Sequence, residues 1–147
     1  MLLGIIFVVS GAITPAQVYQ HAHIPVLIPS VMPDWGVSRV YENVDLAKPG
    51  KYRIYFGLAP HCYAGACDGG SVTGGIQDDM AQFSRDPNRQ SVKLRDGTTA
   101  MFVPFRCGAS CGESVLGFWR HHVWYVVALH AARKAEMLRA ANSMLPR

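Results

Sequence analysis

The sequence predicts an α+β domain, in which one antiparallel β-sheet of about six to eight strands is followed by a C-terminal α-helix packed on it. Half of the 147 residues are apolar and only 16% are charged, while glycine (14) and proline (9) are plentiful. This composition favours turn-rich β structure over a helical bundle or a disordered chain. Short apolar segments with the character of strands recur as far as residue 129. From residue 131 the apolar period becomes that of a helix.

Residues 1–16 are expected to be a signal peptide or an N-terminal hydrophobic anchor, and residues 24–147 a single folded domain. No charged residue precedes Asp34, and the chain begins with a continuously apolar run. Small residues before a scissile bond suit signal peptidase, so a signal peptide would be cleaved after Ala12 or after Ala16. A retained anchor and a buried first strand are the alternatives.

The apolar segments after this leader are interpreted as strands in chain order. They lie at residues 24–29, 37–44, 52–56, 71–73, 92–94, 99–105, 114–119 and 123–129. Prolines restrict residues 24–29 to an edge strand or an extended segment, because proline cannot donate to a central ladder. Residues 123–129 are apolar on both faces, which predicts a central strand. The polar residues 76–90, with the pair Asp78 and Asp79, are expected to form a surface loop.

The C-terminal helix is predicted to bury one face and to expose a basic one. The buried face is expected to consist of Ala131, Ala135, Leu138, Ala141 and Leu145. From residue 120 onward five bases accompany only Glu136, whereas nine earlier bases are balanced by nine acids. Arg133, Lys134 and Arg139 are therefore expected to meet a protein partner or an anionic membrane surface, and an ordinary solvated helix face is the alternative. Nucleic acid is not expected as a partner, because the chain has no dense basic run.

Four cysteines, Cys62, Cys67, Cys107 and Cys111, are expected to form two disulfides, and three pairings are open. Crossed pairing of Cys67 with Cys107 closes a loop of about forty residues and would stabilise by roughly 4 kcal/mol, against about 2 kcal/mol for a local bridge. The glycines and alanines inside both loops let the chain turn back sharply, so local pairing is preferred. Disulfides indicate a location outside the cytoplasm.

Metal binding is the competing interpretation of the same cysteines. Thiolates and imidazoles together suit Cu(I), and the C-x3-C loop and the histidine pair would supply them. The ligands expected in that case are Cys107, Cys111, His121 and His122. A redox-active pair is less favoured, because no helix start is predicted beside the loop to lower a thiol pKa. No cofactor is expected, and since the sequence contains no catalytic constellation, a protein without enzymatic activity is predicted.

Four further motifs lie within about residues 24–145, namely YFGLAPHCYAGACDGGSVTG, the CGASC loop, LGFWRHHVWYVVAL and AEMLRAANSML. Together they resemble a set of uncharacterised exported bacterial proteins. The terminal strand–strand–helix unit is also similar to curved-sheet domains of periplasmic lipoprotein carriers and sigma-factor regulators. The resemblance implies an exported protein with a curved sheet. Four aromatic residues, Phe118, Trp119, Trp124 and Tyr125, would then form core or line an apolar pocket.

Three functions follow as hypotheses. The leading one is an exported, periplasmic or extracellular binding or accessory protein that docks on a membrane-associated complex or the cell envelope, with its N-terminus as a tether if the leader is retained. The second is a carrier that holds an apolar ligand between sheet and helix. The third is a copper- or thiol-dependent factor that uses the C-x3-C loop.

Overall fold

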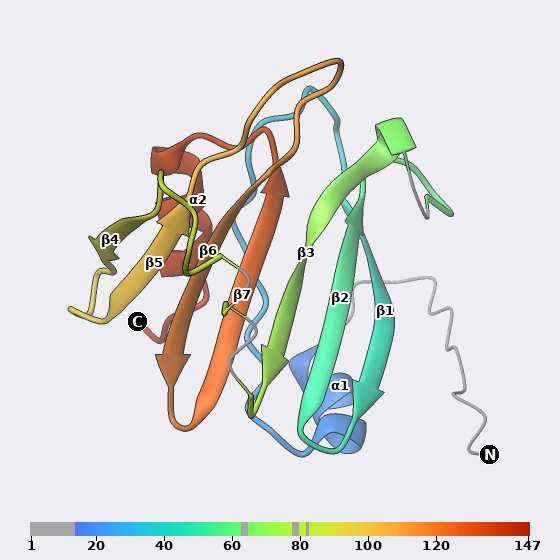
Figure 1. Ribbon diagram of the computed structural model, residues 1–147. Coiled ribbons are helices and arrows are strands. Elements are labelled where there is room, and N and C mark those ends of the chain that lie inside the picture. The colour runs from blue at the N-terminus through green and yellow to red at the C-terminus, as the bar shows by residue number, and fades with distance from the viewer. Residues whose placement is uncertain (1–13, 63–64, 78–79, 82) are drawn as a thin grey trace.

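The computed structural model describes residues 14–62, 65–77, 80–81 and 83–147 (Figure 1). Most of the expected leader and the pair Asp78 and Asp79 lie outside the described residues. One open, curled antiparallel sheet is followed by a C-terminal helix, as the sequence predicts.

Seven strands and two α-helices make up the regular structure of the described residues. The strands are β1 (Tyr41–Lys48), β2 (Lys51–Gly57), β3 (Asp68–Gly75), β4 (Gln90–Lys93), β5 (Thr99–Val103), β6 (Glu113–Arg120) and β7 (Val123–His130). The helices are α1 (Pro15–Ala22) and α2 (Lys134–Ser143), and a 3-10 turn, η1 (Gly65–Cys67), precedes β3. The spatial order is β1-β2-β3-β7-β6-β5-β4. β7 is thus the central strand, as its continuously apolar sequence predicts.

One face of the sheet is closed by α1, α2 and the extended chain between α1 and β1, all of which lie behind the sheet in Figure 1. Two buried tyrosines hold this extended chain in place. The Tyr52 hydroxyl donates to the carbonyl of Leu27 at 2.7 Å and accepts from the amide of the same residue at 3.0 Å. The Tyr125 hydroxyl donates to the carbonyl of Pro25 at 2.7 Å. The predicted segment 24–29 is therefore an extended segment and not a strand.

The helix α1 is a feature that the sequence analysis did not predict. Thr14 caps it, Pro15 occupies its first turn, and the Thr14 side chain accepts from the Gln17 amide while the Gln17 side chain accepts from the Thr14 amide. This reciprocal capping box satisfies amides that would otherwise have no partner at the helix start. Val18 and Ala22 point into the core and are buried.

The helix α2 begins at Lys134, three residues after the predicted start. Ala131 follows β7 directly and has φ +46, outside the right-handed helical region, so the helix cannot begin there. The buried side chains are Met137, Ala140 and Ala141, followed by Met144 and Leu145. Of the predicted face, Ala141 and Leu145 are buried and Ala131 and Leu138 are partly buried. Ala135 is exposed, because at 3.6 residues per turn it lies on the side of the helix opposite the buried Met137.

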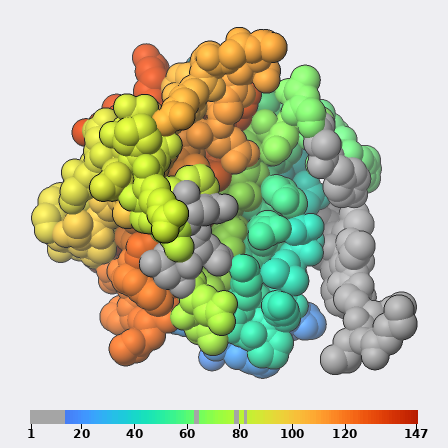
Figure 2. Space-filling view, viewed as in Figure 1, coloured from blue at the N-terminus to red at the C-terminus, as the bar shows by residue number. Residues whose placement is uncertain are grey.

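The opposite face of the sheet is partly covered by the chain between β3 and β4, which crosses in front of β6 and β7 (Figure 1, Figure 2). Met80 is only 1% exposed and Phe83 is half-buried. They pack on the sheet residues Val115, Trp124 and Ala128. Asp86 accepts two hydrogen bonds from Arg106, at 2.9 and 3.1 Å. Most of the described residues between 76 and 90 are exposed, as expected of a surface loop, although Met80 packs against the sheet.

Candidate functional site

Both cysteine pairs form local disulfides, as the small residues in their loops predict. Cys62 is bonded to Cys67 and Cys107 to Cys111, with Cα–Cα distances of 5.9 and 4.0 Å. All four cysteines of the chain lie among the described residues and are paired in this way. The first disulfide joins the loop after β2 to the start of β3, and the second closes the loop before β6.

The residues proposed as metal ligands are not brought together. The disulfide engages Cys107 and Cys111 just before β6, whereas His121 and His122 form the turn after β6. A strand rises by about 3.3 Å per residue, so the length of β6 separates the two groups. Among the described residues, no three His, Cys, Asp or Glu side chains are placed to hold a metal ion.

The four aromatic residues at the end of the β6–β7 hairpin are divided between the two faces of the sheet. Phe118 and Tyr125 are a cross-strand pair in the core, with ring centroids 5.5 Å apart. Trp119 and Trp124 pair on the opposite face, 5.2 Å apart and edge to face. They do not line a common pocket. Trp119 is 45% exposed, and the indole N–H of Trp124 is buried without a hydrogen-bond partner.

The α2 basic face, defined as Arg133, Lys134 and Arg139, is exposed to solvent. Arg133 contacts Glu136 at 3.3 Å, and a carboxylate oxygen of Glu136 accepts the Arg133 backbone N–H at 2.7 Å. Hydrogen bonds from Arg133 lower the pKa of Glu136, so this acid stays charged and engaged with the helix start. Lys134 donates to the side chain of Gln90 on β4 at 2.7 Å.

The fold adds a fourth base to this region that sequence reasoning missed. Arg95 follows β4, and its guanidinium donates to the carbonyls of Leu145 and Pro146 just beyond the end of α2. Its backbone amide donates to Asn142 at 2.8 Å. Arg95 therefore places a positive charge at the negative end of the α2 dipole, where it is favourable. Its position in a polar loop gave no sequence signal for this contact.

A groove of about 590 Å³ lies on the face of the sheet opposite the helices. We call it the sheet groove. Its lining comprises Lys51, Arg53, Tyr55, Asp68, Ser71, Thr73, Phe83, Glu113, Val115, Val126 and Ala128. Directly opposed residues of an antiparallel pair share a face, so the register builds its floor from rows that cross β2, β3, β7 and β6. Phe83, from the chain that covers β6 and β7, forms part of its wall.

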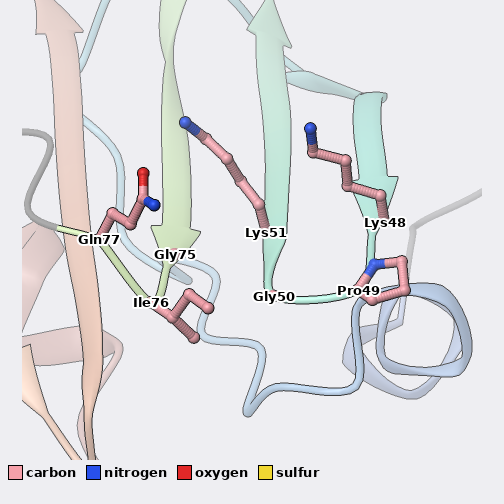
Figure 3. A pocket seen from close by; sticks show the side chains of 7 residues that line it. All are labelled: Lys48, Pro49, Gly50, Lys51, Gly75, Ile76 and Gln77. Atoms are coloured by element: carbon pink, nitrogen blue, oxygen red, sulfur yellow. The ribbon is translucent and has the colours of Figure 1, made fainter.

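One end of the sheet groove is cationic. Lys51 and Arg53 alternate on β2, and Lys48 is the cross-strand partner of Lys51 on β1. Figure 3 shows both lysine amines directed away from the turn at Pro49. Lys51 also lines a second, smaller hollow of about 250 Å³ beside this turn. Arg53 contacts Asp45 at 3.4 Å, with both side chains more than one-third exposed, so the pair contributes little stability.

The other end of the sheet groove is acidic. Glu113 lies at the start of β6 and Asp68 at the start of β3. Loss of hydration and the nearby Asp68 carboxylate raise the pKa of Glu113, against the opposing effect of its cross-strand partner His130. The Glu113 side chain remains accessible to solvent. The two carboxylates thus repel each other, and a bound cation would relieve that repulsion.

The fold and its surfaces define a disulfide-bonded α+β domain with one closed face and one grooved face. No family model, no curated protein and no solved structure matches this chain. Within the part of the chain that the structure describes, no helix has both the length and the apolar character to cross a bilayer.

Proposed function

We propose that this protein is an exported, non-enzymatic binding or accessory protein that docks on an anionic surface of the cell envelope through the α2 basic face. Export is supported by the two disulfides, since such bonds persist in oxidising compartments outside the cytoplasm. The apolar start of the sequence agrees with a leader.

The observation that carries the proposal is the direction of the bases on α2. Met137 and Ala140 are buried beneath the helix, whereas Lys134 and Arg139 are exposed on it. Glu136, the one acid of α2, is held by Arg133. The exposed surface is therefore net positive, and Arg95 adds to it at the end of the helix. A surface of this kind is attracted to acidic headgroups over a distance set by the ionic strength.

Vesicle sedimentation tests this docking. Each base near an anionic surface contributes about 1 kcal/mol, so the triple variant Arg133→Gln, Lys134→Gln, Arg139→Gln should bind phosphatidylglycerol-containing vesicles on the order of 100-fold more weakly at low salt. Wild-type binding should also fall steeply as salt is added.

A second triple variant controls for net charge. Arg39, Arg85 and Arg89 are exposed and lie outside α2. Changing all three to glutamine removes the same charge and should leave most of the binding intact. Equal losses in the two variants, or no binding of wild-type protein to anionic vesicles, would contradict the proposal.

A further inference from the structure

The sheet groove has opposite charges at its two ends, and this arrangement is independent of the α2 basic face. Lys51 and Arg53 lie on β2, whereas Asp68 and Glu113 lie at the starts of β3 and β6. A ligand with a single charge would gain at one end and lose at the other. Charge complementarity therefore selects a ligand whose own positive and negative groups are well separated.

The lining between the two charged ends is polar on one side and apolar on the other. The hydroxyls of Tyr55, Ser71 and Thr73 come from β2 and β3. The apolar wall comes from Phe83 and from β6 and β7, including Val126. Hydroxyls both donate and accept, which suits peptide N–H and C=O groups, and an apolar wall suits side chains on one edge of an extended chain.

The spacing of the charges sets the size of the ligand. Arg53 and Gly117 are the two ends of one cross-strand row, so they are three strand spacings of about 4.8 Å apart. Glu113 lies four residues from Gly117 along β6, at about 3.3 Å per residue. The Cα atoms of Arg53 and Glu113 are thus on the order of 20 Å apart. An extended peptide covers about 3.3–3.6 Å per residue, so about six residues match this span.

We infer that the sheet groove binds a short extended peptide with free ends. Its carboxylate lies at Lys51 and Arg53, and its terminal ammonium lies between Asp68 and Glu113. The guanidinium of Arg53 contacts Asp45 through Nη1 and has further N–H donors that can bind a carboxylate. The ammonium neutralises two neighbouring carboxylates, which makes the acidic end more stable with the ligand than without it.

Pools of random hexapeptides test this inference directly. The protein is incubated with a pool that has free ends, an N-acetylated pool and a C-amidated pool, and the retained peptides are quantified by mass spectrometry after size exclusion. The free-ended pool should be retained at least tenfold better than either blocked pool. No retention of any pool, or equal retention of all three, would overturn the inference.

Two variants assign each end of the ligand to its end of the groove. Arg53→Gln should abolish the preference for a free carboxylate and keep the preference for a free amine. Glu113→Gln should do the reverse. Arg39→Gln and Asp34→Asn, at exposed positions outside the groove, should leave both preferences unchanged. Binding that is unaffected by both groove variants would place the peptide elsewhere and overturn the inference, whatever the result with vesicles.

Discussion

Met80 packs into the space that Gly117 leaves on β6: a Cβ atom at position 117 would collide with Cγ of Met80. This contact fixes the chain between β3 and β4 on the half of the sheet formed by β6 and β7. Met80 and Phe83, from the described part of this chain, pack on the β6 and β7 half, whereas the basic and hydroxyl-bearing side chains of the sheet groove lie on β2 and β3. The contact between Met80 and Gly117, which are far apart in sequence, therefore determines where this chain packs on the face of the sheet opposite the helices.

Gly117→Val should destabilise the protein even though valine favours strands. The new side chain must displace Met80 or strain the sheet, at a cost of about 1–3 kcal/mol in the free energy of unfolding. Urea denaturation measures this loss, and Gly108→Ala is the control, because nothing lies within 4 Å of a Cβ at that position. In a Met80→Ala background the cost of Gly117→Val should shrink. Equal costs in the two backgrounds would show that Met80 is not the obstacle.

Ser114 is predicted to be structural, although its position before a histidine pair could suggest a nucleophile. It is fully buried, accepts from the amide of Phe105 at 3.0 Å and donates to the carbonyl of Ala132. It also lies at the opposite end of β6 from His121. Ser114→Ala leaves two buried backbone groups without a partner and should cost about 1–3 kcal/mol of unfolding free energy. Ser110→Ala, at an exposed position, should change stability little by the same denaturation assay.

The strand pattern of the sheet could be predicted because it is local. In β2 the buried residues Tyr52, Ile54 and Phe56 alternate with partly or largely accessible ones, and the apolar sequence of β7 predicts its central place. The local disulfides also follow from small residues within each loop. β1 starts later than predicted, at Tyr41, because its pairing with β2 extends down to the turn at Pro49.

The sheet groove could not be predicted, because its ends come from strands that meet only through the register. Arg53 and Glu113 are far apart in sequence, and two intervening strands lie between them. The alternation of polar residues on β2 indicated an accessible face of that strand. It did not indicate which residues of the other strands share that face. The helix α1 had a usable signal, since Thr14, Pro15 and Gln17 form a capping box with proline in the first turn.

Glu113 should make the protein less stable as pH rises. Loss of hydration and the Asp68 carboxylate raise its folded-state pKa above 4.5, so the folded state holds this proton more tightly than the unfolded chain. Stability contributed by the protonated form is present below the unfolded pKa and is lost as pH rises through the folded pKa. Glu113→Gln should remove this loss and be more stable than wild type at neutral pH. Urea unfolding measured from about pH 4 to about pH 8 tests this prediction.

Asp96 provides a control of opposite sign. Hydrogen bonds from Thr98, and a smaller effect of Arg120, lower its pKa to about 2. Its contribution to stability is present above the unfolded value of 3.8 and is lost as pH falls toward 2. Asp96→Asn should therefore flatten the acid side of the stability profile and leave the Glu113 region unchanged. If Glu113→Gln instead follows the wild-type profile at every pH, the carboxyl is not perturbed by its surroundings.

If the protein is exported, the helix α1 favours cleavage of the leader after Ala12 over cleavage after Ala16. Cleavage there leaves Thr14 and Pro15 in place, whereas cleavage after Ala16 removes both and with them the reciprocal capping of Gln17. Loss of such a cap costs about 1 kcal/mol, and the shortened helix would hold its buried residues less firmly. Intact mass and N-terminal sequencing of protein from the extracytoplasmic fraction of its host should find the residue after Ala12 first. Ala12→Leu should block processing, and Ala16→Leu, at an exposed helical position, should not. A mature chain that starts after Ala16 would contradict this prediction. A mature chain that keeps Met1 would also contradict it and would favour a retained anchor.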